Sequence, residues 1–239
     1  MVMNERFSRQ SLIIGEDATA ALSTKRVALF GVGGVGSYAA EALARCGVGH
    51  VELIDSDVVS ESNVNRQLCA LTSTVGLPKV EVVAARMKDV NPDIDVTARQ
   101  EFLLPENADG FDFSSYDFVI DAIDTVSAKI EIAVRCAALG VPMVSCMGTG
   151  NKLDPSALRI SDLAKTSGCP LARVMRRELK KRGVLHLPVV YSEEQPIKQD
   201  SPVFAENGKQ VPGSIAFVPA TAGLLAASAA IKTLIGLGS

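Results

Sequence analysis

Residues 26–55 read RVALFGVGGVGSYAAEALARCGVGHVELID, and this stretch decides the fold. The apolar run 26–30 ends at a glycine cluster, and residues 35–46 then carry apolar side chains at helical spacing. Two glycines after residue 46 end that helix, and a second apolar run covers 51–54. A strand, a glycine-rich turn, a helix and a second strand form a βαβ unit, which predicts the start of a parallel sheet.

The rest of the chain continues this alternation of strands and helices. Further helices are predicted at 77–90 and 127–139, and strands at 94–98, 117–122, 142–146, 188–191 and 214–218. We therefore expect an α/β protein with a doubly wound, mainly parallel, Rossmann-like sheet. We expect one domain with three parts: a nucleotide-binding core (1–150), a basic helix with a long mobile crossover loop (151–212), and a returning strand and helix (213–239).

The composition of the 239 residues excludes several function classes. With 24 Lys and Arg against 27 Asp and Glu, the net charge of −3 excludes a protein that coats nucleic acid through bulk charge. The aromatic content of 5%, without Trp, argues against a stacking platform for single strands. The five cysteines form no C-x-x-C pair, so a zinc ribbon or a thioredoxin-like site is disfavoured. An odd number of thiols and a polar start without a secretory signal predict a cytoplasmic protein.

Two segments near the carboxyl end allow more than one interpretation. Residues 213–238 are mostly small and apolar, and they fit either a strand followed by a helix packed closely against a sheet or a second subunit, or a membrane segment. Pro219 and Lys232 favour the buried helix, so no membrane insertion is expected. Residues 192–212 contain three prolines and no sustained period, which predicts a loop longer than a compact domain normally tolerates without a functional reason. This loop is either a lid or crossover that a partner orders, or plain disorder.

The glycine cluster predicts a nucleotide site. Gly31, Gly33 and Gly36 form a G-x-G-x-x-G pattern between a strand and a helix, where backbone N–H groups can approach phosphate. Asp55 ends the next strand, where a carboxylate can accept hydrogen bonds from ribose hydroxyls. This pattern alone indicates a nucleotide with an adenosine half, for which NAD or FAD is the usual ligand. A glycine turn without any ligand is the simpler alternative.

The residues after Asp55 favour a triphosphate instead. Arg66 and Lys79 follow the ribose-binding strand end, and cations there suit the charge that builds on an α-phosphate and on departing pyrophosphate. The sequence DAIDT places Asp121 and Asp124 at the carboxyl end of a further strand, where a carboxylate can hold magnesium between phosphates. Arg66 or Lys79 alone could be a solvated surface charge, but the two cations together with Asp124 predict an ATP site.

These motifs resemble the adenylating domain of the ubiquitin-activating-enzyme superfamily, the ThiF/MoeB/HesA group. The strings GVGGVGS, SNVNRQ, GLPK and DAID carry the resemblance, which covers roughly residues 5–150 and returns at 213–236. It implies a homodimer in which ATP is cleaved to AMP and pyrophosphate by attack of a substrate carboxylate, with Arg9 reaching the partner subunit's ATP. The implied nucleotide-binding residues are Gly31, Gly33, Gly34, Gly36, Asp55, Asp57, Asn63, Arg66, Gln67, Lys79 and Asp124. Of these, Arg66, Lys79 and Asp124, with Arg9, carry the chemistry, and Asp124 is the magnesium ligand.

The segment DLAKTSGCPLARVMRRELKKRG (162–183) is similar to the tRNA threonylcarbamoyladenosine dehydratase (TcdA/CsdL-like) branch of that superfamily. The resemblance implies adenylation of the threonine carboxylate of the modified adenosine, followed by closure of an oxazolone ring. Residues 165–182 contain seven Lys and Arg against one acid, a basic face suited to RNA phosphate or merely a solvated helix. The candidate tRNA contacts are Arg173, Arg176, Arg177 and Lys180.

Other functions remain open. An adenylyltransferase that charges the C-terminal glycine of a ubiquitin-like sulfur carrier would share the ATP site. A scaffold that binds ATP without turnover and meets a cysteine desulfurase or sulfur acceptor is another alternative, and an NAD dehydrogenase is more distant. Cys169 is the one cysteine outside a predicted core element and is the candidate nucleophile, although cyclisation needs none. His50 and His186 are interpreted as surface or packing residues.

Overall fold

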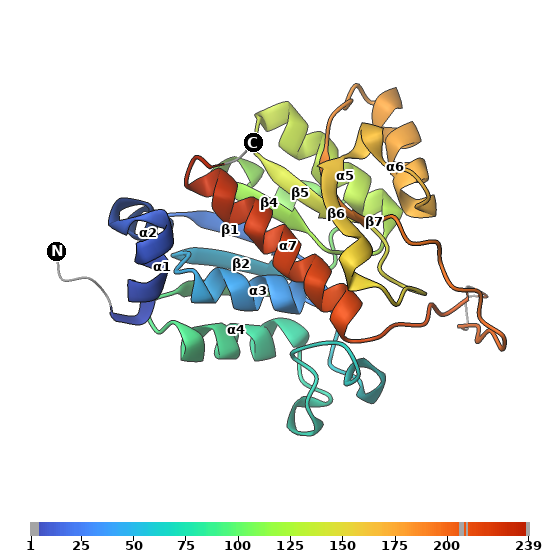
Figure 1. The fold of residues 1–239 in the computed structure, drawn as a ribbon, viewed down its shortest axis with the longest axis horizontal. Coiled ribbons are helices and arrows are strands. Elements are labelled where there is room, and N and C mark those ends of the chain that lie inside the picture. The colour runs from blue at the N-terminus through green and yellow to red at the C-terminus, as the bar shows by residue number, and fades with distance from the viewer. Residues whose placement is uncertain (1–4, 206–207, 209, 238–239) are drawn as a thin grey trace.

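The computed structural model describes residues 5–205, 208 and 210–237, and it confirms the α/β, doubly wound fold (Figure 1). Seven strands form one sheet in the order β3-β2-β1-β4-β5-β7-β6. Six of them run parallel, and β6 is antiparallel to β7. The strands are β1 (Arg26–Phe30), β2 (His50–Ile54), β3 (Asp95–Arg99), β4 (Phe118–Asp121), β5 (Met143–Cys146), β6 (Leu158–Asp162) and β7 (Pro188–Ser192).

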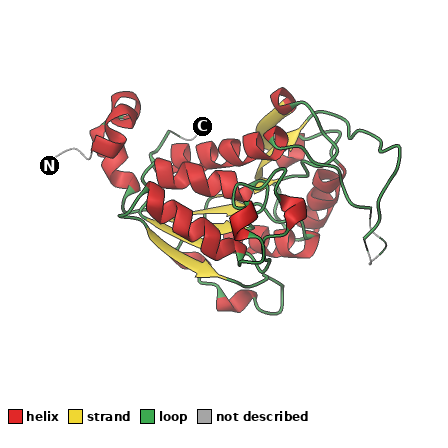
Figure 2. Cartoon of the chain, turned by 90° about the horizontal axis from the view of Figure 1, so that it is seen from below, coloured by secondary structure: helices red, strands yellow, loops and turns green. Residues whose placement is uncertain are grey.

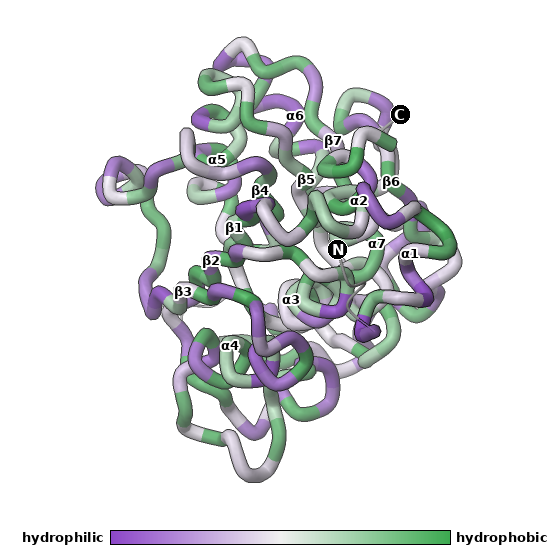
Figure 3. The backbone as a smooth tube through the Cα atoms, turned by 90° about the vertical axis from the view of Figure 1, so that its left-hand side faces the viewer, coloured by the Kyte–Doolittle hydropathy of each residue, from purple (hydrophilic) through white to green (hydrophobic). Residues whose placement is uncertain are grey.

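Helices cover both faces of the sheet. On one face α3 (Gly36–Arg45) packs against α4 (Lys79–Val90) and α7 (Phe217–Leu234), and α3 and α7 lie side by side (Figures 1 and 3). On the other face α5 (Val126–Leu139) packs against α6 (Pro170–Lys181). Central strands such as β1 are buried nearly throughout because both of their faces are covered, which explains their continuous apolar runs.

The order in which the chain adds strands to the sheet reverses between β1 and β4. From β1 the chain proceeds outward to β2 and β3, and it then returns to place β4 on the other side of β1. The loops that follow these two strands therefore diverge, and they leave a crevice at the carboxyl edge of the sheet. The glycine turn follows β1 and Asp124 follows β4, so the topology brings the predicted nucleotide residues to this crevice.

The apolar carboxyl-terminal segment forms α7, which packs closely on α3. A Cβ atom added at Gly223 would lie 2.2 Å from the Val35 carbonyl oxygen, so only glycine permits this approach of the two backbones. Within the described part of the chain, α7 is the one helix that is long and apolar enough to cross a membrane. Its packing against α3 and the sheet favours the interpretation as a buried helix.

Three features differ from the sequence-based expectations. The strand predicted at 214–218 was wrong: residues 211–215 are irregular, and α7 begins at Phe217. The backbone there bonds to loops at the crevice rather than to a strand, as described below. Strand β6 was not predicted, nor were the two short helices α1 (Ser8–Ile14) and α2 (Glu16–Leu22) at the opposite end of the sheet.

A long irregular segment joins β7 to α7. We call residues 193–216 the crossover segment; its described part contains no helix or strand beyond an isolated bridge between Phe204 and Gln210. Figure 2 shows this loop extending from the body of the protein on the side opposite the N-terminal helices. The sequence predicted an irregular loop at 192–212, and Ser192 is in fact the last residue of β7.

Candidate nucleotide site and basic helix

The glycine turn is shaped by contacts that exclude side chains. Gly31 has φ +87°, and a Cβ atom there would lie 2.8 Å from the Ala122 carbonyl oxygen. A Cβ atom at Gly36 would lie 1.8 Å from the Gly31 carbonyl oxygen, so α3 can begin only where residue 36 is glycine. Gly33 and Gly34 line the crevice at the start of this helix. Helix N-termini present free backbone N–H groups, which suit a phosphate.

Asp55 anchors the turn from the end of β2. One carboxylate oxygen accepts from the Val32 backbone N–H at 2.8 Å, and the other accepts from the Asp57 N–H at 2.9 Å. Burial raises the pKa of Asp55 above its usual value, against the opposing effect of these two donors. A carboxylate has about four acceptor positions, so both oxygens can still accept from a ligand hydroxyl.

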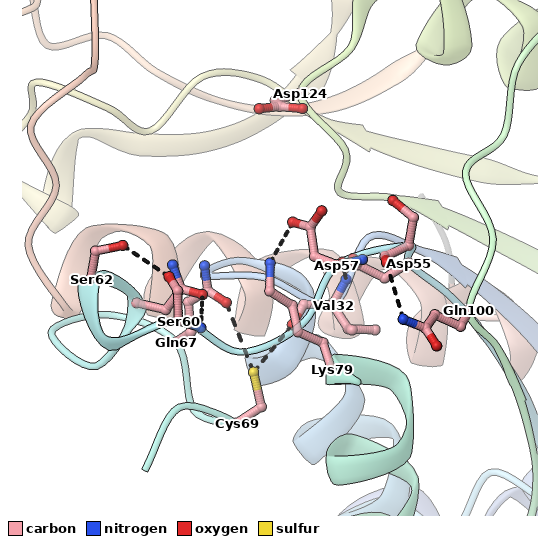
Figure 4. A network of polar contacts seen from close by, with 12 residues as sticks. Val32, Asp55, Asp57, Ser60, Ser62, Gln67, Cys69, Lys79, Gln100 and Asp124 are labelled. Atoms are coloured by element: carbon pink, nitrogen blue, oxygen red, sulfur yellow. Dashed lines mark hydrogen bonds and ion pairs between the residues drawn. The ribbon is translucent and has the colours of Figure 1, made fainter. Parts of the chain in front are cut away.

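Lys79 is a nearly buried cation at the first position of α4. Its ammonium group lies 2.6 Å from an Asp57 carboxylate oxygen, and 5% of the residue is exposed (Figure 4). Its backbone N–H also donates to the Asp57 carbonyl oxygen at 3.0 Å. Asp57 itself is exposed. The ion pair thus holds a buried ammonium group at the wall of the crevice.

The SNVNRQ segment forms a tight loop beside the glycine turn. The Asn63 side chain accepts from the Ser60 backbone N–H at 3.1 Å, and the Asn63 carbonyl oxygen accepts from the N–H groups of Arg66 and Gln67. The Arg66 guanidinium group donates to the Asn65 side-chain oxygen at 2.9 Å. Asn63 and Gln67 are buried, whereas Arg66 is half-buried.

Asp124 lies on the opposite wall, and a buried ion pair supports its loop. The Lys129 ammonium group lies 2.9 Å from an Asp121 carboxylate oxygen, and both side chains are fully buried. Lys129 also donates to the carbonyl oxygens of Ile123, at 3.1 Å, and Cys146, at 2.8 Å. These bonds fix the loop from Asp121 to Asp124. In Figure 4, Asp124 lies across the site from Lys79 and Asp57.

Together these elements enclose a crevice of about 460 Å³, within the range of ligand pockets. Gly36 supports the turn without lining the crevice, and Arg9 lies elsewhere, exposed on α1. Sequence reasoning missed several residues of the wall, including Phe102, Leu103, Thr149, Ser214 and Pro219. The sequence-predicted residues that line the crevice are Gly31, Gly33, Gly34, Asp55, Asp57, Asn63, Arg66, Gln67, Lys79 and Asp124.

The basic helix α6 presents most of its predicted cations outward. Its buried residues are Ala172, Met175 and Leu179, which pack against the α5 side of the sheet. The side chains of Arg173, Arg177 and Lys180 are exposed. The spacing of three and four residues places them along one outer face of the helix.

Arg176 differs from the other three predicted RNA contacts. Its guanidinium group points to the turn before α6, where it donates to the Leu163 carbonyl oxygen at 2.9 Å and to the Thr166 carbonyl oxygen at 2.7 Å. A third bond reaches the Thr166 hydroxyl group at 2.8 Å. Arg176 therefore holds the LAKT turn against the helix.

Glu178 offsets part of the positive charge on α6. Its carboxylate lies within 3.1 Å of cations on Arg177, Lys181 and Arg182, and the hydrogen bond from Lys181 is the largest cause that lowers the pKa of Glu178 to about 2. Arg173 and Lys180 form no ion pair with the part of the chain that the structure describes.

None of the cysteines or histidines lines the crevice, although the buried Cys69 thiol lies directly behind its wall, 3.8 Å from the Gln67 side-chain oxygen (Figure 4). Cys169 is only 5% exposed at the start of α6, and burial raises the pKa of Cys136 and Cys146 to about 12. His50 and His186 lie near the surface, each about 3 Å from an aspartate that the sequence did not suggest. None of the five cysteines lines the crevice, so the described geometry offers no thiol to an activated acyl group there.

A glycine turn, a carboxylate at the end of the next strand and two cations lie at the switch point of a doubly wound sheet, an arrangement typical of nucleotide-binding α/β proteins. The ThiF family profile matches residues 7–239, and the chain belongs to this family. A tRNA threonylcarbamoyladenosine dehydratase of Bacillus subtilis (strain 168) is 44% identical in an alignment that covers 93% of this chain and 92% of that protein. The Escherichia coli (strain K12) dehydratase is 36% identical in an alignment that covers 96% of this chain and 93% of that protein. The crystal structure of the E. coli dehydratase in complex with ATP superposes with a TM-score of 0.89 at 35% identity, covering 99% of this chain and 98% of that one.

Proposed function

We propose that this protein is an ATP-dependent tRNA threonylcarbamoyladenosine dehydratase. The proposal depends on finding two features in one chain: the crevice residues and the similarity to dehydratases. A crevice at the switch point gathers Asp55, Arg66, Lys79 and Asp124, and the similarity to named dehydratases extends beyond this crevice to nearly the whole chain. The ATP complex of a relative with the same fold supports ATP as the nucleotide.

The reaction has two bond-forming steps. A threonine carboxylate oxygen bonds to the α-phosphorus of ATP, and the bond from this phosphorus to pyrophosphate breaks. The ureido oxygen then bonds to the activated carbonyl carbon, AMP leaves with the carboxylate oxygen, and a ureido nitrogen loses its proton. Because both reacting groups belong to one nucleoside, proximity supplies much of the advantage of the second step.

The residues of the crevice suit the first step. Asp55 accepts from ribose hydroxyls, and the glycine turn offers backbone N–H groups to the phosphates. The ammonium group of Lys79 and the guanidinium group of Arg66 stabilise the negative charge that grows on the α-phosphate and on pyrophosphate. Both cations are held before ATP arrives, Lys79 by Asp57 and Arg66 by Asn65, so little reorganisation is needed.

The crevice also fits a magnesium ion that ATP brings with it. Magnesium in nucleotide enzymes is held by one or two carboxylates together with phosphate oxygens and water. The described residues contain no group of three or more potential metal ligands from His, Cys, Asp or Glu, which disfavours a metal held by protein alone. Asp124 is exposed on the crevice wall and would be the protein ligand, where the ion supplies charge neutralisation at the phosphates.

The test of the function is pyrophosphate release with ATP and magnesium. We expect release with tRNA that carries threonylcarbamoyladenosine and none with the same tRNA lacking the modification. Mass spectrometry of the digested RNA should show the loss of one water from the modified nucleoside. Release that requires a ubiquitin-like carrier and ignores tRNA would transfer the assignment to a carrier adenylyltransferase, and ATP binding without turnover would indicate a scaffold.

The outer face of α6 would contact tRNA. The double variant Arg173→Ala/Lys180→Ala is expected to weaken tRNA binding, because it removes two cations that contact phosphate. The slope of log affinity against log salt should become shallower by about 1 for each lost contact. Fluorescence titration at several salt concentrations measures this slope. The matched control is Lys88→Ala/Lys232→Ala, which removes two exposed lysines from α4 and α7 on the other face of the sheet. Equal slopes for the two double variants would exclude α6 as the RNA surface.

A cytoplasmic homodimer completes the proposal. Arg9 lies outside the crevice of its own chain, on α1, where Leu12 and Ile13 are 86% and 85% exposed. Two exposed apolar side chains beside Arg9 suit contact with a second copy, which could bring this arginine to the partner's ATP. Mixing inactive Arg9→Ala protein with inactive Lys79→Ala protein should restore activity through one intact composite site. No recovery after subunit exchange would exclude the action of Arg9 at the partner's ATP.

A further inference from the structure

Asn151 adopts a backbone conformation that side chains seldom take. Its φ is +57°, and it is the one residue other than glycine with a positive φ in the described part of the chain. Asparagine tolerates this left-handed conformation better than most residues. Asn151 follows the loop after β5, and Thr149, two residues earlier, lines the crevice. Unusual backbone conformations of this kind are often held where function requires them.

Asn151 bonds to both arms of the crossover segment. Its backbone N–H donates to the Gly213 carbonyl oxygen at 2.7 Å, and its side-chain oxygen accepts from the Gly213 N–H at 2.6 Å. The same side-chain oxygen accepts from the Gln199 amide at 2.9 Å. The Ile197 N–H donates to the Asn151 carbonyl oxygen at 2.7 Å. One residue therefore clasps the outgoing and the returning arm of the segment.

Neighbouring residues tighten this clasp. A Cβ atom at Gly150 would lie 2.7 Å from the Pro212 side chain, so the two backbones approach closely. Lys152 is nearly buried, and its ammonium group donates to the Glu194 carbonyl oxygen at 2.6 Å. The Glu194 carboxylate in turn accepts from the Leu153 backbone N–H at 2.9 Å. The turn at 150–153 thus fixes the crossover segment near its beginning and near its end.

The clasp stands at the mouth of the nucleotide crevice. Ser214, the residue after the clasped Gly213, lines the crevice together with Thr149. The Asn65 amide donates to the Ser214 carbonyl oxygen at 2.9 Å, and the Asn65 side-chain oxygen accepts from Arg66. The returning arm is therefore tied on one side to Asn151 and on the other to the loop that carries the phosphate-site arginine.

Beyond the clasp, the crossover segment exposes apolar side chains. Val203 and Phe204 are 65% and 61% exposed on a loop that projects past the sheet (Figure 1). Unpaired RNA bases stack on exposed aromatic side chains, and modified nucleosides in single-stranded loops can be splayed out for this contact. The segment thus combines a surface for an unpaired base with an attachment beside the phosphates.

We propose that Asn151 is a positioning residue for the RNA-dependent step. By holding the crossover segment at the mouth of the crevice, it sets where the modified nucleoside lies relative to the α-phosphate of ATP. This inference rests on the proposed function, because it assigns the crossover segment to the RNA substrate. It adds a residue that does not line the crevice and acts through Gly213, Ser214 and Gln199.

Two variants separate the side chain from the backbone. Asn151→Gly keeps the left-handed backbone and removes the side-chain acceptor, whereas Asn151→Asp keeps an acceptor for both donors. We expect the glycine variant to retain wild-type affinity for ATP and to lose about 10- to 100-fold in kcat/KM for the modified tRNA. The aspartate variant should recover most of this loss. Trypsin should cleave the glycine variant faster than wild type after Lys198, in the arm that Asn151 holds.

The outcomes distinguish the inference from the function on which it rests. A glycine variant with wild-type kcat/KM for modified tRNA would overturn the positioning role. A glycine variant that loses ATP affinity in the same proportion would do so as well, because it would indicate a general structural defect. If the wild-type protein shows no RNA-dependent turnover, the proposed function fails, while faster cleavage after Lys198 still reports whether the clasp exists.

Discussion

Lys129→Met is expected to lower the free energy of unfolding by about 3–5 kcal/mol, because the variant leaves a buried carboxylate without its cation. Lys129 and Asp121 are both fully buried and lie 2.9 Å apart. The Ser145 hydroxyl group donates to the same Asp121 oxygen at 2.6 Å and the Ile123 backbone N–H to the other at 3.3 Å, but neutral donors do not replace a positive charge. Urea denaturation measures the loss directly, with the slope of the transition showing whether unfolding stays cooperative.

Matched variants separate the charge from the loss of packing. The double variant Asp121→Asn/Lys129→Met removes both charges and should recover most of the lost stability, since buried ion pairs are often neutral overall when both partners are replaced. Lys88→Met, at an exposed position of α4, should change stability by no more than about 0.5 kcal/mol. If the free energy of unfolding of Lys129→Met stays within about 1 kcal/mol of wild type, well below the cost of breaking a buried ion pair, then water or a rearranged side chain compensates the charge of Asp121.

The parts of the fold that local patterns determine were predictable from the sequence. The unit from β1 to β2 follows from apolar periodicity and from glycines at positions where a side chain would clash. Strand β6 was not predictable in this way, because it is an edge strand that forms only where tertiary structure brings it beside β7. The segment at 214–218 has strand-like composition, but Gly213 and Ser214 bond to loops at the crevice instead.

The crevice residues that belong to a known sequence motif were predictable from the sequence. Asp55 and Lys79 stand in such motifs, and the structure places both at the crevice. Residues that act through tertiary partners gave a weaker signal. Lys129 is a lone cation on the buried face of an apolar helix, which could have suggested a buried partner, but the sequence does not show that the partner is Asp121. The inward direction of Arg176 depends on the turn at 163–166, which only the fold brings beside α6.

Lys79→Ala is expected to lower kcat for pyrophosphate release by about 10²- to 10³-fold, the usual cost of losing one preorganised group that stabilises transition-state charge. The Lys79 ammonium group is held at the crevice wall by Asp57, so its charge is in place when negative charge develops on the α-phosphate. The loss should fall more on kcat than on the KM for ATP, because the growing charge is present only in the transition state. Steady-state kinetics with modified tRNA in excess measures both constants.

The control is a lysine in a similar ion pair far from the crevice. Lys25 lies 3.5 Å from Asp117 beside the opposite end of β1, and Lys25→Ala should leave kcat unchanged. Lys79→Arg should not restore the rate, because a guanidinium group is larger and planar and cannot replace a compact ammonium group at a buried position. Asp57 is 64% exposed on its side chain, and the half-buried Asp55 keeps its two backbone N–H donors, so the variant should remain folded. A folded Lys79→Ala protein with the wild-type kcat would exclude this lysine from the chemistry and leave Arg66 as the cation at the α-phosphate.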